Sequence, residues 1–190
     1  MQIWYIYKMK TELVSKIDQS TAHRKSREQL SNYILRNLDM LSDFIEIAFD
    51  TSDKNHVKAF WSLELVCEKK LKVFVPYLDL FCEVLPKLKD DSAVRPATKI
   101  CLFLSKSNHR KNGISLTQEQ EHLLIEALLD RLIQNEKVAA KVYAMRALFM
   151  LGKKYYWVHD ELKNIIEQDY VNHSAAYQAA TRNLLKKLNK

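Results

Sequence analysis

Glycine and proline are scarce in this sequence: among 190 residues there are two glycines and three prolines. Average usage would give about 13 glycines and about 10 prolines in a chain of this length. The two glycines, Gly113 and Gly152, lie far apart, so the chain has neither a P-loop nor a glycine-rich dinucleotide-binding turn. β-Sandwiches and β-barrels need glycine-bearing turns at short intervals. The shortage excludes these nucleotide-binding and β-sheet classes and favours an all-α fold.

Long apolar runs and metal-ligand motifs are also missing. No run of about 18 apolar residues occurs, so we expect no membrane-spanning helix and no membrane partner. The histidines and cysteines form no CxxC, HxxxH or HExxH pattern, and GxSxG does not occur. The sequence therefore predicts no metal, no cofactor and no catalytic residues. Cys67, Cys82 and Cys101 each lie in an apolar helical pattern, which indicates buried free thiols and a reducing, cytoplasmic location.

The first eight residues, MQIWYIYK, form a short apolar segment. A secretory signal needs a longer apolar region and a small-residue cleavage site, so we expect no signal peptide. Two interpretations stay open: the segment is a hydrophobic arm docked on the core, or translation begins at Met9. A separate functional hypothesis is that Trp4, Tyr5, Ile6 and Tyr7 form an exposed patch through which a structural helical-repeat protein self-associates.

Apolar residues at helical spacing occupy most of the chain. We expect a short helix over 11–17, a second over 22–36, and then helices in pairs. The expected pairs are 38–49 with 54–70, 74–88 with 92–105, 118–135 with 137–154, and 158–169 with 174–188. Pro76 and Pro96 suit first helical turns, and Thr117 with Gln120 predicts a capping box. Pairs that recur roughly every 35–45 residues are typical of helical-hairpin solenoids.

One of these pairs carries a family resemblance. Residues 77–97, YLDLFCEVLPKLKDDSAVRPA, resemble a HEAT repeat, with an apolar first helix, an Asp-bearing turn and Val-Arg-x-Ala opening the second helix. Asp91, Val94, Arg95 and Ala97 fill that pattern. The chain is similar to short bacterial HEAT-like proteins. The resemblance implies one domain over 1–190, with an arm and capping helices over 1–36 and a right-handed α-solenoid of about four hairpins over 37–190.

Charge divides between the two helices of each expected pair. With their adjoining turns, the first helices hold five basic and fifteen acidic residues, and the second helices hold eighteen basic and five acidic residues. In the HEAT-like family the second helices line the concave face, so the resemblance implies a basic groove. Such a groove favours an acidic protein segment or a nucleic-acid backbone as partner. The alternative is a solvated face, because lysines near helix ends also complement the helix dipole.

The preferred function is a non-enzymatic interaction scaffold that binds such a partner in this groove. Candidate groove residues are Lys58, Trp61, Arg95, Lys99, Lys141, Arg146 and Arg182. Arg95 has a second interpretation, an ion pair with Asp90 or Asp91. The alternative function is DNA-alkylation repair: Trp61 and Glu64 lie one helical turn apart, and this pair resembles the aromatic–carboxylate cluster with which HEAT-like alkylpurine DNA glycosylases hold a cationic base.

Overall fold

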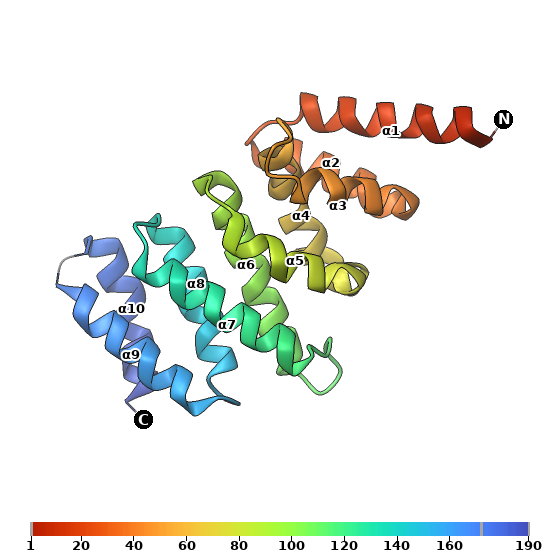
Figure 1. Ribbon diagram of the computed structural model, residues 1–190. Helices are drawn as coiled ribbons and strands as arrows, with labels where there is room; N and C mark the ends of the chain where they lie inside the picture. Colours follow the sequence, from red (N-terminus) through yellow and green to blue (C-terminus); the bar gives the residue numbers. More distant parts are fainter. Residues whose placement is uncertain (1, 172, 190) are drawn as a thin grey trace. The chain divides into compact units, whose positions relative to one another are not determined.

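The computed structural model describes residues 2–171 and 173–189, and their side chains from residue 10 onward. Over these residues the chain is helical and contains no β-strand, as the composition predicts (Figure 1). None of the described helices combines the length and the apolar character needed to cross a bilayer. The α-helices are α1 (Gln2–Gln19), α2 (Arg24–Arg36), α3 (Leu41–Phe49), α4 (His56–Lys70), α5 (Leu78–Val84), α6 (Asp91–Asn108), α7 (Gln118–Ile133), α8 (Val138–Leu151), α9 (Tyr156–Tyr170) and α10 (Ala175–Leu188). Short 3-10 helices are η1 (Leu38–Met40), η2 (Leu71–Tyr77) and η3 (Leu85–Lys87).

Two expected helices differ from those observed. The continuous helix expected over 74–88 is wrong, because the chain forms η2, α5 and η3 in succession there. Pro76 lies inside η2 and Pro86 lies in the first turn of η3, and proline has no N–H to continue an α-helical ladder. The helix expected over 11–17 is too short, since α1 begins at Gln2. The side chains of residues 4–7 lie outside the described residues, so self-association through them stays a prediction.

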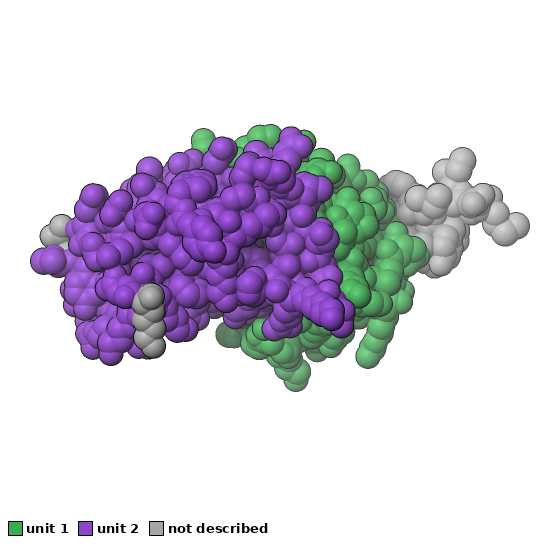
Figure 2. Space-filling view, turned by 90° about the horizontal axis from the view of Figure 1, so that it is seen from below, with its two compact units in different colours: residues 1–97 green, residues 98–190 purple. Residues whose placement is uncertain are grey.

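The chain groups into two compact units, residues 1–97 and 98–190, which Figure 2 shows in different colours. The division falls inside α6. The single domain expected over 1–190, with its segments 1–36 and 37–190, stays a prediction.

Unit 1 is built around aromatic rings. Helix α4 packs against α1, α2 and α3, and α5 packs against α3. The rings of Phe60 and Phe81 lie with their centroids 5.8 and 6.0 Å from that of Phe49. Phe74 meets Phe81 edge-on at 5.3 Å. Because these rings come from α3, α4, η2 and α5, the cluster joins the four elements through apolar burial.

Unit 2 contains two helical hairpins. Helix α7 packs against α8, and α9 packs against α10. Between the hairpins, α7 contacts α9, while α8 contacts both α9 and α10. The contacts therefore form two layers, one of α7 and α9 and the other of α8 and α10. The capping box predicted for Thr117 and Gln120 is confirmed at the start of α7, and the Ser174 hydroxyl caps α10 by accepting a hydrogen bond from the N–H of Tyr177.

Both glycines occupy positions of close approach. Neither has a positive φ, so backbone strain does not explain them. A Cβ at Gly113 would lie 1.6 Å from the carbonyl oxygen of Ser107, and a Cβ at Gly152 would lie 2.1 Å from Cδ2 of His159. Gly152 also follows the last residue of α8. It thus ends α8 and admits the His159 ring of α9.

Candidate functional site

Charge is sorted by layer in unit 2. Helix α7 holds four acidic residues and one basic residue, and α9 holds the same numbers. Helices α8 and α10 contain no Asp or Glu, while α8 carries two basic residues and α10 carries three. The helices α8 and α10 therefore carry cations and no carboxylate of their own. Such a surface attracts anions more strongly than one on which the two signs alternate.

A hollow of about 560 Å³ opens between α8 and α10. Four of its lining side chains are cationic, seven are apolar and none is acidic. The cations are Lys106, Arg146, Lys153 and Lys187, and the apolar residues are Val142, Met145, Phe149, Met150, Ala179, Ala180 and Leu184. The hollow thus combines apolar surface with positive charge, and only Asn183 adds a neutral polar group.

Phe149 is held in this hollow by contacts on several sides. The ammonium groups of Lys153 and Lys187 each lie 5.9 Å from the centroid of its ring, within the range of a cation–π contact. His159 stacks on the same ring at 5.1 Å, with 20° between the planes. Nε2 of His159 also lies 2.9 Å from the carbonyl oxygen of Phe149, to which its N–H donates. Gly152 admits the His159 ring, so it supports the position of Phe149.

Lys141 is placed differently from its expected role in the groove. Its side chain is 4% exposed, and its ammonium donates a hydrogen bond of 2.6 Å to the carbonyl oxygen of Leu132. The same ammonium lies 3.4 Å from a carboxylate oxygen of Asp169 and 3.4 Å from Nε2 of His173. Lys141 therefore joins α8 to α9 and to the following turn, and its charge does not reach the hollow.

His173 and Tyr177 pack beside that ammonium. The two rings stack with centroids 4.0 Å apart. The hydroxyl of Tyr177 is buried and has no hydrogen-bond partner among the described residues. Burial, assisted by the negative charge of Asp169, raises the pKa of Tyr177 to about 12. The hydroxyl therefore stays neutral at physiological pH.

A second internal ion pair involves Lys154, the neighbour of Lys153. Its ammonium donates to the buried carboxylate of Glu121. Tyr155 and Asn108 each donate a further hydrogen bond of 2.6 Å to that carboxylate. Burial by itself would raise the pKa of Glu121, but these donors outweigh it and hold the pKa below its usual value. Lys154 consequently stabilises the fold, whereas Lys153 lines the hollow.

The remaining candidates of unit 2 occupy three different settings. Arg146 is exposed and lines the hollow. Lys99 lies with its ammonium 5.3 Å from the centroid of the Phe103 ring. Arg182 is exposed on α10 outside the lining of the hollow. Of the seven predicted groove residues, Arg146 is the one that the hollow includes.

The three candidates of unit 1 make contacts within that unit. The ammonium of Lys58 donates to the carbonyl oxygen of Asp18. The indole N–H of Trp61 donates a hydrogen bond of 3.0 Å to the carbonyl oxygen of Ser92. Nη2 of Arg95 lies 3.4 Å from a carboxylate oxygen of Glu64. These contacts join α4 to α1 and to the first turns of α6.

Glu64 itself is closed off from solvent. Its side chain is 2% exposed, and Arg27 approaches the same oxygen at 4.0 Å. A carboxylate that binds a flipped base has to be accessible in a pocket. The geometry favours a structural role for Glu64, in which guanidinium groups compensate a buried charge.

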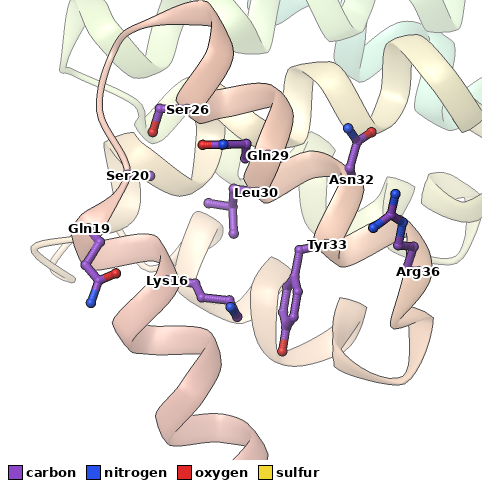
Figure 3. A pocket seen from close by; sticks show the side chains of 9 residues that line it. All are labelled: Lys16, Gln19, Ser20, Ser26, Gln29, Leu30, Asn32, Tyr33 and Arg36. Atoms are coloured by element: carbon purple, nitrogen blue, oxygen red, sulfur yellow. The ribbon is translucent and has the colours of Figure 1, made fainter.

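A second hollow, of about 600 Å³, lies in unit 1 beside α1 and α2 (Figure 3). Leu30 contributes its apolar side chain, and the rest of the lining is polar or cationic. Lys16 and Tyr33 are engaged there, because the ammonium lies 4.5 Å from the ring centroid and the Tyr33 hydroxyl donates to Glu12. This hollow lacks the apolar surface found between α8 and α10.

Comparisons with family models, curated proteins and solved structures find no match. The resemblance to HEAT repeats therefore rests on residues 77–97, and function has to be argued from the site itself. Among the described side chains, no group of three or more His, Cys, Asp or Glu residues could hold a metal ion. The hollow between α8 and α10 is the site with the most distinctive chemistry.

Sequence reasoning missed the residues that give this hollow its character. Lys153 and Lys187 lie near helix ends, where the helix dipole accounts for basic residues. Phe149 lies in an apolar helical pattern, which predicts an ordinary core residue. The available signal was the complete absence of acidic residues from 138–151 and 175–188. The lack of acidic residues sets α8 and α10 apart from α7 and α9, and it can be read from the sequence without the fold.

Proposed function

We propose that this chain is a non-enzymatic interaction scaffold that binds an acidic amphipathic segment of a partner protein. The observation that carries the proposal is the hollow between α8 and α10, where an apolar floor meets cations and no acid. An amphipathic helix places apolar side chains on one face, with charged residues along its edges. Laid between α8 and α10, such a helix would bury its apolar face while its carboxylates meet the lysines and the arginine.

The apolar floor favours a protein segment over a nucleic-acid backbone. Phosphate contacts need cations and hydrogen-bond donors, and apolar floor residues add little to them. Acidic peptides with apolar anchors would use both features of the hollow, because burying the anchors removes apolar surface from water. Binding of a nucleic acid is the competing outcome in the experiment below.

The proposal includes an architecture for the whole chain. The two layers of unit 2, the hairpin of α3 and α4, and the HEAT-like run over 77–97 support a right-handed solenoid of about four HEAT-like hairpins. In that arrangement α4, α6, α8 and α10 form the concave face. The three cysteines are free and buried, which supports a reducing cytoplasm as the location.

The test compares three probes with the native chain by fluorescence anisotropy. The first is an acidic amphipathic peptide of about 18 residues, which forms five helical turns. The second is the same peptide with its apolar anchors replaced by serine, and the third is a single-stranded oligonucleotide. We expect the first peptide to bind most tightly and to weaken between about 50 mM and about 300 mM salt. Tighter binding of the oligonucleotide, or equal binding of the two peptides, would contradict the proposal.

Two neighbouring lysines provide a matched pair of variants. Lys187→Glu reverses a charge in the hollow, while Lys186→Glu makes the same change on α10 outside the lining. An exposed ion pair contributes about 0.2–1 kcal/mol. Because reversing Lys187 replaces one such attraction with a repulsion of similar size, the Kd of the acidic peptide should rise about two- to thirtyfold. The Lys186 variant should change the Kd less. Equal increases in Kd for the two variants would mean that the peptide responds to the net charge of the protein and does not bind in the hollow.

A further inference from the structure

Helix α9 exposes an aromatic and acidic surface at its start. Tyr156 is 77% exposed and Trp157 is 52% exposed. Asp160 and Glu161, one turn further along, are also exposed. At 100° per residue these four side chains occupy one continuous arc of the helix. We call Tyr156, Trp157, Asp160 and Glu161 the α9 patch.

Within one chain the α9 patch faces away from the hollow. The buried residues of α9 are Val158, Leu162 and Ile166, and they lie on the arc opposite the patch. Because α9 contacts α8 and α10, its apolar stripe faces those helices. The patch is consequently directed toward solvent. Aromatic residues are enriched in protein–protein interfaces, and adjoining exposed apolar side chains mark candidate interaction surfaces.

The chemistry of the α9 patch matches what the hollow is proposed to bind. The patch offers aromatic rings and two carboxylates, and the hollow offers apolar surface and four cations without an acid. We propose that the occupant of the hollow between α8 and α10 is the α9 patch of a second copy of this chain, an inference that rests on the proposed function. Tyr156 and Trp157 cover the apolar floor, and Asp160 and Glu161 pair with the surrounding cations.

The contact has a defined symmetry. The α9 patch belongs to the layer of α7 and α9, whereas the hollow belongs to the layer of α8 and α10. Each copy therefore offers one kind of surface and receives the other, which makes the interface heterologous. A heterologous interface joins copies head to tail, so each added copy leaves a free hollow at one end and a free patch at the other, unless the rotation between copies closes a ring. The contact is small and belongs to the weak class of interfaces.

The experiment measures the mass of the full chain by analytical ultracentrifugation. Because weak interfaces dissociate at micromolar concentration, the series should reach about 1 mM. We expect the average mass to rise with concentration in about 50 mM salt and to fall toward the monomer in about 500 mM salt. A chain that stays monomeric throughout the series would overturn the inference.

Two variants make the test specific to this interface. Tyr156→Ser with Trp157→Ser removes the patch, and Lys153→Glu with Lys187→Glu reverses two cations of the hollow. Each double variant alone should remain monomeric. Mixed in equal amounts, the two should form a 1:1 dimer and nothing larger, because one contributes an intact hollow and the other an intact patch. Self-association of either variant alone, or no dimer in the mixture, would overturn the inference.

Controls separate this inference from the proposed function. Ile133→Ser removes an exposed apolar side chain outside the patch, and Lys186→Glu changes a charge outside the hollow; both variants should assemble as the native chain does. Binding of the acidic peptide distinguishes failure of this inference from failure of the proposed function. If the native chain binds that peptide but stays monomeric, the proposed function stands and the second copy is overturned as occupant. If neither occurs, both fail.

Discussion

Replacing Gly152 with alanine tests how closely the end of α8 packs against α9. The added Cβ would lie 2.1 Å from Cδ2 and 2.5 Å from Nε2 of His159, so the ring must move. Moving it breaks the hydrogen bond to the carbonyl oxygen of Phe149 and the stacking on that ring. The first loss costs about 0.5–1.5 kcal/mol and the second about 0.5–1.5 kcal/mol.

A gain in the opposite direction is also expected. Gly152 has helical backbone angles, φ −60° and ψ −17°, and alanine favours such a conformation over glycine by about 0.5–1 kcal/mol. The net destabilisation of Gly152→Ala is therefore about 0–2.5 kcal/mol. Urea unfolding followed by circular dichroism measures it.

The decisive comparison uses a chain that already carries His159→Ala. With the ring removed, the added methyl group meets no obstacle, so Gly152→Ala should change sign and stabilise the chain by about 0.5–1 kcal/mol. The two substitutions thus form a double-mutant cycle with a large coupling energy. A stabilising effect in the native background would refute the reasoning, as would equal destabilisation in both backgrounds.

Three further predictions concern buried groups. Glu121→Ala leaves the donors Lys154 and Tyr155 without their acceptor and should lower the free energy of unfolding by about 2–4 kcal/mol in urea titrations. The folded state holds the pKa of Glu121 below its usual value. The difference in free energy of unfolding between the native chain and Glu121→Gln should therefore be fully present above about pH 5 and shrink as the pH falls below about 4. A difference that does not change with pH would be inconsistent with this. Burial raises the pKa of Cys82 to about 11. At pH 8 this thiol should therefore react with a thiol reagent at least about a hundredfold more slowly in the folded chain than in the chain unfolded by urea. Equal reaction rates would contradict its burial.

Local signals in the sequence were sufficient for most helices. The capping box of Thr117 and Gln120 depends on residues three positions apart, so it could be predicted without the fold. The interrupted segment around Pro76 and Pro86 was missed because Pro76 alone fits a first helical turn. Two prolines ten residues apart leave room for only the short helix α5 between them.

The candidate site was harder to predict because it depends on packing between helices. Lys141 and Arg146 are both basic residues of α8, yet one is buried against Leu132 and Asp169 while the other is exposed. Helical periodicity shows that they differ in direction, but it does not show which direction meets α9. The same limit applies to Lys153, which joins the hollow because α10 lies beside α8.

The sorted charges of unit 2 affect how the protein behaves on an ion-exchange column. Helices α7 and α9 each carry a net charge of −3, from four acidic residues and one basic residue. Helices α8 and α10 carry +2 and +3 without an acidic residue. At about 0.01 M salt the Debye length is about 30 Å, so a resin senses both layers and the net charge decides which resin binds. At pH 7 and low salt the net charge of +7 should therefore give retention by cation exchangers, with the layer of α8 and α10 turned toward the resin.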